Sequence, residues 1–201
     1  MTRLILIRHG ETDGNVETRR QGRKDSPLNS RGVAQAAMVC EYVNARFDFS
    51  NVWSSPLQRC TNTASGLDAE VTISDLLIEL DYGEWEGMLE SEIAAQHPNR
   101  YQNSQLSMDP PGGENRSNLP IRGREFLLET QLNSGDVEGD VVIVGHSSAL
   151  TGLLVALLDV PDYAMHNLMI DNCSVSTVDV GSGFNRLTSL NYTEHLASIE
   201  G

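Results

Sequence analysis

Two short, wholly apolar stretches lead into similar sequences, and this feature most limits how the chain can fold. Residues 4–7 lead into Arg8-His9-Gly10, and residues 141–144 lead into Gly145-His146-Ser147. Apolar runs of this length are typical of strands covered on both faces, as in a parallel sheet. The carboxyl ends of such strands line the ligand crevice of an open α/β sheet. We therefore expect the two histidines, distant in sequence, to form one site.

The rest of the chain alternates between strand and helix patterns. A strand is expected at 51–54, a strand or irregular segment at 71–78, and paired strands at 173–180 and 184–191. Apolar spacing predicts helices over 30–43, 57–66, 89–97, 120–133 and 148–158. The prolines and glycines within 99–118 indicate a long loop or lid. This order predicts a single α/β domain over 1–201, a three-layer sandwich with a mostly parallel central sheet flanked by helices.

Charge is distributed unevenly along the chain and favours a small anionic ligand. The formal net charge is −14, whereas the first 31 residues carry seven basic and four acidic side chains. An acidic body argues against nucleic acid and against an anionic membrane as partners. A local cationic island suits a small anion, although these charges could equally just solvate the segment.

The apolar stretches and the cysteines indicate a soluble, cytoplasmic protein. The apolar run at 149–158 is too short to span a bilayer, and the first residues lack the apolar core of a signal peptide. Three widely spaced cysteines, Cys40, Cys60 and Cys173, suggest neither a disulfide framework nor a zinc site. We expect them to be small buried side chains in a reducing compartment.

The residues beside His9 indicate an anion site rather than a metal site. Arg8 offers a planar fork of donors for phosphate oxygens, and Gly10 removes a side chain where a ligand must come close. A guanidinium group repels a divalent cation, and no convincing carboxylate or cysteine ligand spacing accompanies the histidines. We therefore expect no metal and no cofactor.

Five motifs, in the same order, resemble those of the histidine phosphatase superfamily, which contains cofactor-dependent phosphoglycerate mutases and many small phosphatases. They are RHGET (8–12), SSPLQRCTNTA (54–64), LIELDYGEWEG (77–87), PGGE (111–114) and VGH (144–146). Asn15 and Gln21-Gly22 also stand where the family has an asparagine and a loop after the first motif. The resemblance covers nearly the whole chain, and the order of the motifs is far more specific than a lone Arg-His-Gly triplet.

The resemblance implies a metal-independent phosphomonoester hydrolase that forms a phosphohistidine. His9 would be the nucleophile, and Arg8 and Arg59 would hold the non-bridging oxygens. His146 would donate to the same phosphoryl group. The general acid of the family falls at Glu79, which would protonate the leaving oxygen and then activate water.

The other candidates are expected to contact a small phosphorylated metabolite. The predicted substrate-binding residues are Asn15, Arg20, Gln21, Gly22 and Ser147. Arg23 and the loop 112–116 could also reach the substrate, whereas Arg122 could equally brace the fold. Asp13-Gly14 and Ser147-Ser148 replace an aromatic residue and two glycines that are common in relatives, so the identity of the ester stays open.

Two alternatives remain beside hydrolysis. Phosphoglycerate mutases of this family carry inserted segments that keep water from the phosphoenzyme, whereas only about 25 residues separate Gly87 from Pro111 here, which favours a hydrolase. A non-catalytic phosphate-binding regulatory module would have little reason to retain both the nucleophile and the acid. The sequence leaves the oligomeric state open, a homodimer included.

Overall fold

A six-stranded sheet with the order β3-β2-β4-β1-β5-β6 forms the centre of the computed structural model, which describes residues 2–98, 109–134, 137, 139–181 and 183–199. The strands β1, β2, β3 and β4 are mutually parallel, β5 runs antiparallel to β1, and β6 runs antiparallel to β5. Their bounds are Thr2–Arg8 (β1), Phe49–Ser54 (β2), Val71–Ile73 (β3), Asp140–Gly145 (β4), Val175–Val180 (β5) and Arg186–Tyr192 (β6). The mostly parallel sheet expected from the sequence is confirmed.

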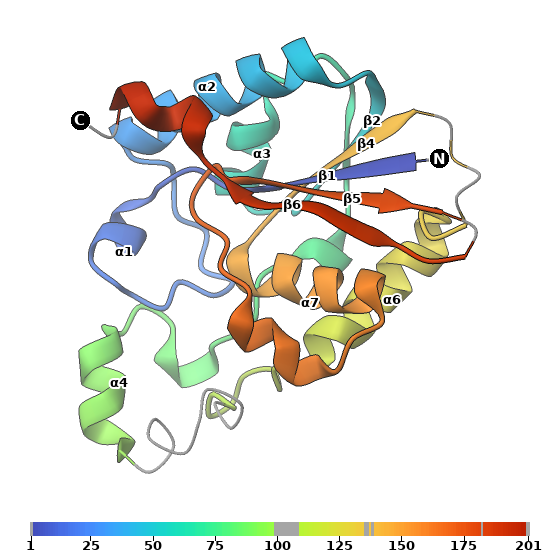
Figure 1. The fold of residues 1–201 in the computed structure, drawn as a ribbon. Coiled ribbons are helices and arrows are strands. Elements are labelled where there is room, and N and C mark those ends of the chain that lie inside the picture. The colour runs from blue at the N-terminus through green and yellow to red at the C-terminus, as the bar shows by residue number, and fades with distance from the viewer. Residues whose placement is uncertain (1, 99–108, 135–136, 138, 182, 200–201) are drawn as a thin grey trace.

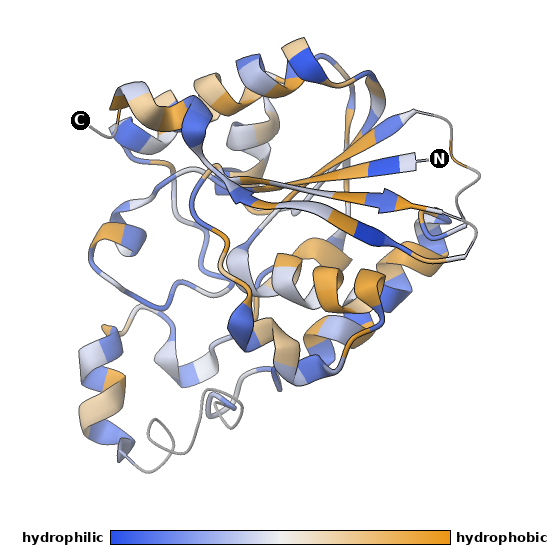
Figure 2. Ribbon diagram, viewed as in Figure 1, coloured by the Kyte–Doolittle hydropathy of each residue, from blue (hydrophilic) through white to orange (hydrophobic). Residues whose placement is uncertain are grey.

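Helices cover both faces of this sheet (Figure 1). One face carries α2 (Ser30–Arg46) and α3 (Gln58–Ala64), and the other carries α6 (Asn118–Thr130) and α7 (Ser147–Leu158). The alternation of side chains along a strand explains the two layers. In β1, Leu4 and Leu6 pack with α6 and α7, whereas Ile5 and Ile7 pack with α2 and α3. The central strands and α7 are accordingly the most hydrophobic parts of the ribbon (Figure 2).

The register of the two central strands places the two histidines next to each other. β1 and β4 are neighbours and parallel, with Arg8 opposite Gly145. The next residue of each strand is a histidine, so His9 and His146 leave the sheet side by side. His9 donates its backbone N–H to the Gly145 carbonyl at 2.9 Å, which extends the ladder to the first histidine.

A third group of apolar residues holds a peripheral segment against α7. This segment contains the 3-10 helices η1 (Asp75–Leu77) and η2 (Gly83–Trp85) and the helix α4 (Glu90–Gln96). Leu80, Trp85 and Ile93 from the segment pack with Val155 of α7. The packing fixes the part of the chain that carries Glu79.

The remaining elements refine the expectations from the sequence. A four-residue helix, α1 (Asp13–Val16), was not predicted, and two 3-10 helices, η4 (Asp162–Asn167) and η5 (Glu194–Ile199), lie before β5 and after β6. The segment 71–78, expected to be a strand or irregular, is a strand up to Ile73 and then turns into η1. The helix α6 ends at Thr130, three residues earlier than predicted, where Gln131 adopts a left-handed backbone conformation. Of the predicted lid, residues 99–108 lie outside the described part of the chain.

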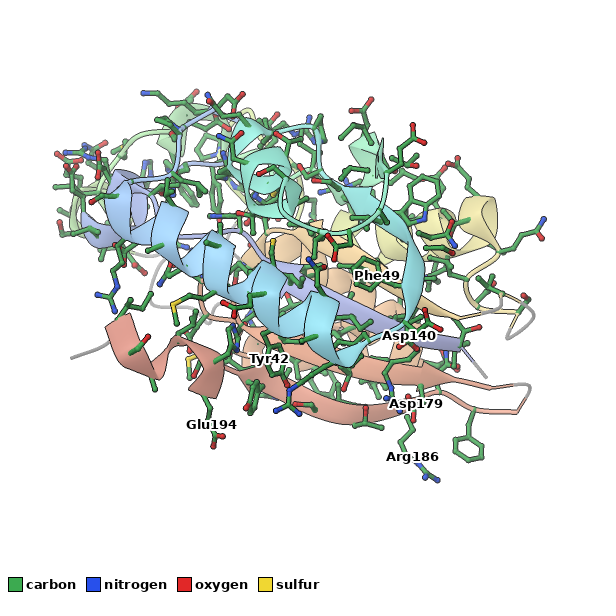
Figure 3. All side chains as sticks on the ribbon, turned by 90° about the horizontal axis from the view of Figure 1, so that it is seen from above. Tyr42, Phe49, Asp140, Asp179, Arg186 and Glu194 are labelled. Carbon is green, nitrogen blue, oxygen red and sulfur yellow. The ribbon has the colours of Figure 1, made fainter. Side chains whose placement is uncertain are left out.

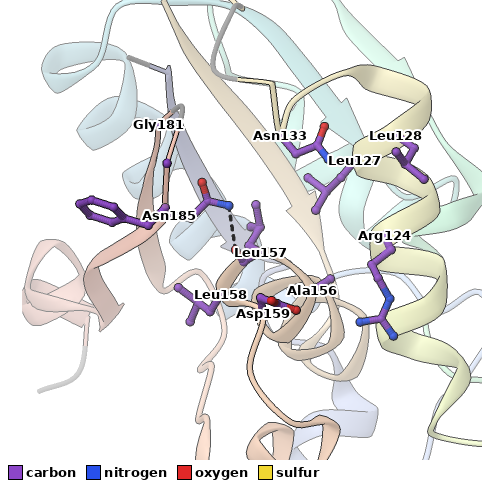
Figure 4. Close-up of a pocket in the computed structure, with 12 residues that line it drawn as sticks. Arg124, Leu127, Leu128, Asn133, Ala156, Leu157, Leu158, Asp159, Gly181 and Asn185 are labelled. Atoms are coloured by element: carbon purple, nitrogen blue, oxygen red, sulfur yellow. Dashed lines mark hydrogen bonds between the residues drawn. The ribbon is translucent and has the colours of Figure 1, made fainter.

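The opposite end of the sheet carries an ion pair and a second cavity. Arg3 donates to Asp179 at 2.7 Å, and Asp179 faces Arg186 across the β5–β6 pair, near Asp140 (Figure 3). A cavity of about 600 Å³ lies between the ends of α6 and α7 and the β5–β6 connection, next to the exposed side chain of Phe184 (Figure 4). None of the helices in the described ranges is long and apolar enough to cross a membrane.

Candidate active site

A polar cavity of about 300 Å³ lies where β1 and β4 end. Nine of the ten residues predicted for the site line this cavity, and the tenth, His146, lies behind its wall. The lining residues, from loops and elements far apart in sequence, are Arg8, His9, Asn15, Arg19, Arg20, Gln21, Gly22, Arg59, Glu79, Tyr82, Arg116, Ser147 and Ser148.

The hydrogen bond of His9 fixes which ring nitrogen is free to react. Its Nδ1 lies 2.7 Å from the carbonyl oxygen of Gly10, which can only accept, so Nδ1 carries the proton. Burial lowers the pKa of His9 well below its usual range, and the nearby Arg8 and Arg59 lower it further. The ring is therefore neutral at pH 7, and the lone pair lies on Nε2. This is the form that a nucleophilic histidine requires.

Gly10 allows a close approach of two backbone segments beside His9. A Cβ at this position would lie 2.5 Å from the carbonyl oxygen of Gly32 in α2. The Gly10 amide donates to Thr63 Oγ1 of α3 at 3.0 Å. Contacts with α2 and α3 thus hold Gly10, whose carbonyl oxygen accepts the hydrogen bond from His9 Nδ1. Backbone packing therefore sets the orientation of the imidazole.

Two arginines from different elements bring positive charge to the cavity. Arg59 is 1% exposed and donates to the backbone carbonyls of Gly22 and Lys24, at 2.7 and 2.9 Å. Arg8 donates to the Ile170 carbonyl at 2.7 Å, while its buried Nε has no hydrogen-bond partner. Neither guanidinium forms an ion pair with a carboxylate in the described residues. Guanidinium groups that no carboxylate contacts directly favour the binding of an anion.

His146 supports the site from behind. Its ring centroid lies 5.1 Å from that of His9, and the side chain is fully buried. Arg59 Nε lies 3.2 Å from Nδ1 and can only donate, so in the neutral ring the proton lies on Nε2, which is 2.7 Å from Ser55 Oγ. Burial, and then Arg59, lowers the pKa of His146 well below its usual range. Both ring nitrogens are engaged within the protein, and His146 positions Arg59.

Glu79 is held by backbone N–H groups rather than by a cation. Its carboxylate oxygens accept from the amides of Leu80 at 2.8 Å, Ala149 at 3.2 Å and Ser148 at 3.3 Å. The last two amides belong to the first turn of α7, where unpaired N–H groups favour an oxygen acceptor. The side chain is 8% exposed and reaches the cavity. The carboxylate therefore lies at the wall of the same cavity as His9.

Hydrogen bonds within the protein hold three of the predicted substrate-binding residues, Asn15, Arg20 and Gln21, in place. Gln21 accepts a hydrogen bond from Thr12 at 2.9 Å, and Asn15 Oδ1 accepts from the Thr12 amide and from Asn172. Arg20 is bonded to Glu90 at 2.9 Å and lies over the ring of Tyr82. These contacts order the wall before any ligand arrives.

The structure also shows which residues the sequence reasoning missed or left open. Arg19, Tyr82 and Ser148 line the cavity and were not singled out as site residues, although Arg19 belongs to the cationic island. Arg122 braces the fold, because it binds Glu114 and the carbonyls of Leu76 and Ile78. Among the described residues, no group of three or more His, Cys, Asp or Glu side chains could hold a metal ion.

The comparisons with known proteins agree with this geometry. The chain belongs to the histidine phosphatase superfamily (branch 1), whose family model matches residues 4–193. It is 32% identical to phosphoserine phosphatase 1 of Hydrogenobacter thermophilus over 206 residues, which cover 99% of this chain and 96% of that protein. It spans about 55% of the length of three mycobacterial relatives that it matches at 31% identity.

Solved structures of relatives share the whole fold. The phosphoserine phosphatase of Entamoeba histolytica in complex with 3-phosphoglyceric acid has a TM-score of 0.84 at 29% identity, with 98% of this chain and 100% of that chain covered. A mycobacterial glucosyl-3-phosphoglycerate phosphatase with VO3 has a TM-score of 0.86 at 30% identity, with 95% and 99% covered. The expected family and the α/β sandwich are thereby confirmed.

Proposed function

We propose that this protein is a phosphomonoester hydrolase that acts on a small phosphorylated metabolite through a phosphohistidine at His9. The observation that carries the proposal is that His9, whose Nδ1 donates to the Gly10 carbonyl, lines one cavity together with Arg8 and Arg59, two guanidinium groups that form no ion pair with the described residues. A phosphoryl dianion would restore charge balance there and lie beside the nucleophile. Relatives that are named as phosphatases support the same class of reaction.

The arrangement supports a two-step transfer in which each proton has a carrier. In the first step Nε2 of His9 attacks phosphorus, the ester P–O bond breaks, and the leaving oxygen takes the proton of the Glu79 carboxyl group. Arg8 and Arg59 stabilise the charge on the non-bridging oxygens. In the second step water attacks the phosphohistidine, Glu79 accepts a proton from that water, and inorganic phosphate leaves with the neutral His9 restored.

A panel of phosphate monoesters assayed in the presence of EDTA tests this proposal. We expect inorganic phosphate to be released, His9→Ala to be inactive but folded, and an alkali-stable, acid-labile phosphoenzyme to be trapped only when His9 is present. Formation of 2-phosphoglycerate from 3-phosphoglycerate and its bisphosphate primer, faster than phosphate release, would identify a mutase instead. Binding of phosphate without turnover of any ester would indicate a regulatory module.

A further inference from the structure

The segment that connects η4 with β5 contacts Arg8 and His9 at three points. The Cys173 amide donates to the Arg8 carbonyl at 3.0 Å, and the Arg8 side chain donates to the Ile170 carbonyl at 2.7 Å. Between these contacts, the side chain of Asn172 donates from Nδ2 to the His9 carbonyl at 2.9 Å. This connection therefore borders the end of β1, and Asn172 contacts His9 itself.

The same segment forms a tight turn whose backbone conformation is held by its surroundings. The Ser174 amide donates to the Asp171 carbonyl at 3.0 Å, so Asn172 and Cys173 occupy the centre of the turn. Cys173 has a φ of 53°, a left-handed conformation that is unfavourable for a residue with a Cβ. Such a conformation persists where neighbours fix it. Here the Cys173 amide is bonded to β1, and its carbonyl lies 3.0 Å from His195 Nε2.

Asn172 also contacts Asn15, a predicted substrate-binding residue. Its Nδ2 lies 3.3 Å from Asn15 Oδ1, and the backbone amide of Thr12 donates to the same oxygen at 3.1 Å. A backbone amide can only donate, so the Asn15 atom between Thr12 and Asn172 is the carbonyl oxygen. This oxygen and the His9 carbonyl are both acceptors. The group of Asn172 that faces them is therefore its NH2 group, which has one hydrogen for each acceptor.

These contacts leave the NH2 group of Asn15 for a ligand. Asn15 Oδ1 has two donors within the protein, whereas its Nδ2 forms no hydrogen bond with the described residues. If the amide rotated by 180°, its NH2 group would face the donors of Thr12 and Asn172, which is unfavourable. Asn15 lines the same cavity as His9. Its side chain is therefore held as a hydrogen-bond donor at that cavity.

We infer that Asn172 is a positioning residue: it joins the His9 main chain to the Asn15 side chain and thereby keeps Asn15 as a donor to the phosphoryl group. The inference rests on the proposed function, because it takes the phosphoryl group to lie at His9. Asn172 is not among the described residues that line the cavity, so it acts on the ligand through Asn15. Hydrogen bonds to charged oxygens are about twice as strong as neutral ones, so the direction of the Asn15 amide matters most when an anion is bound.

A double-mutant cycle between Asn172 and Asn15 tests the inference, with inorganic phosphate as the probe. Asn15→Ala and Asn172→Ala should each lower the affinity for phosphate about tenfold in calorimetric titration. Because Asn172 acts through Asn15, Asn172→Ala should lower the affinity less than about threefold in the Asn15→Ala background. Values of kcat/KM for the best ester of the panel should show the same coupling.

Asn172→Asp is a second variant, of nearly the same shape but with the opposite hydrogen bonding. Its carboxylate would face two acceptors and would favour rotation of the Asn15 amide, which turns Oδ1 toward the ligand. Its charge also repels the anion directly. Phosphate affinity should therefore fall further than in Asn172→Ala, and Asn15→Ala should remove part of that extra loss. Asn172→Asp takes the place of Asn172→Ala in the cycle if the alanine variant does not fold.

Asn185→Ala is the matched control. Asn185 is also a half-buried asparagine, and its Nδ2 donates to the Leu157 carbonyl at 2.7 Å beside the remote cavity (Figure 4). Its substitution should lower the urea midpoint about as much as Asn172→Ala does, but should leave the affinity for phosphate unchanged. A loss of phosphate affinity that follows the loss of stability in both variants would make Asn172 a merely structural residue, and would overturn the inference.

The phosphate titrations separate this inference from the proposed function, because they require no turnover. Coupling between Asn172 and Asn15 supports the inference even if no ester is hydrolysed. Effects of the two substitutions that simply multiply overturn it, whatever the outcome of the activity panel. A phosphate affinity that Asn172→Ala leaves within about twofold of the wild-type value overturns it equally.

Discussion

The two ends of the sheet carry cavities of opposite character. The cavity at the carboxyl ends of β1 and β4 has a volume of about 300 Å³ and is lined by five arginines and one glutamate. The cavity at the other end is about 600 Å³ and is lined by one arginine, one aspartate and several apolar residues. Buried side-chain nitrogens without partners occur in Arg8 and Arg116 at the first cavity, and in no described lining residue of the second.

The difference shows that size is a poor guide to function in this molecule. Uncompensated charge is costly in a folded protein, and it persists where a ligand or a reaction makes use of it. The smaller cavity has this property, whereas the larger one is a surface hollow between packed elements. The expected effects of substitutions at the two ends therefore differ, and each experiment below measures that difference.

Removing the His9 imidazole, the proposed nucleophile, should have the largest effect. His9→Ala should lower kcat/KM by at least about 10⁴-fold, because no other described group offers a lone pair at the same place. Phosphate release from the best ester of the panel measures the loss. Phe184→Ala at the remote cavity should retain full activity, since that side chain is 69% exposed and far from the site. Residual turnover above one per cent in His9→Ala would argue against covalent catalysis.

The next largest effect is expected when one arginine at each end of the sheet is replaced, because only the one at the smaller cavity should lower kcat/KM. Arg59→Gln should lower kcat/KM by about 10²- to 10³-fold, because it removes charge stabilisation of the transition state. Arg124→Gln should change it less than twofold. Inorganic phosphate should raise the melting temperature of the wild-type protein and of Arg124→Gln, and much less that of Arg59→Gln. Equal protection of all three proteins would place the anion site elsewhere.

Glycines at the two ends should respond differently to an added methyl group. Gly10→Ala should lower the free energy of unfolding by about 1–3 kcal/mol, since its Cβ would meet the backbone of Gly32 at 2.5 Å. Gly183→Ala should change it by less than about 0.5 kcal/mol, because nothing lies within 4 Å of its Cβ. Urea denaturation measures both values. Similar losses for the two variants would contradict the close backbone approach between Gly10 and Gly32.

The buried histidines should make stability depend on pH. The pKa values of His9 and His146 are lowered in the folded state, so between those values and about 6.5 the unfolded chain binds more protons than the folded one. The two histidines therefore contribute to the free energy of unfolding in full above about pH 6.5. This contribution falls as the pH is lowered, by up to about 1.4 kcal/mol per pH unit for each histidine.

Urea denaturation between pH 7 and pH 5 measures this dependence. His9→Asn should show a shallower loss of stability than the wild-type protein, by about one proton. Phe184→Ala should keep the wild-type slope. Identical slopes in all three proteins would mean that His9 is protonated in the fold.

The ion pair at the remote end of the sheet should matter least. Arg3 and Asp179 have side chains that are 43% and 19% exposed, and solvent screens such pairs. Arg3→Gln should lower the free energy of unfolding by less than about 1 kcal/mol, and less still in 1 M salt. Urea denaturation at two salt concentrations provides the measurement. A loss above about 2 kcal/mol would show that solvent does not screen the Arg3–Asp179 ion pair.

The sequence predicted the parts of the molecule that follow from periodicity and from contiguous motifs. The apolar runs of β1 and β4 identified two central strands, and the histidine after each located the site edge, because parallel neighbours end together. The family motifs identified Arg8, Arg59 and Glu79, and the structure brings these three side chains to one cavity.

The residues that the sequence did not reveal depend on tertiary geometry. Tyr82 lies within a recognised motif, but its place on the cavity wall depends on the packing of residues 80–93 against α7. The position of His146 behind the wall depends on Ser55 and Arg59 from another part of the chain. The unpaired state of Arg116 emerges only after the partners of Glu114 are known. No local pattern carries such information.

The tether of Glu79 to α7 has a consequence for how this protein can change. Because main-chain amides of residues 148 and 149 hold the carboxylate, a new side chain at those positions leaves the tether in place unless the residue is proline. Ser147, one residue earlier, lines the cavity and lies outside the tether. A change at residue 147 can therefore reshape the cavity wall while the Glu79 carboxylate keeps its position.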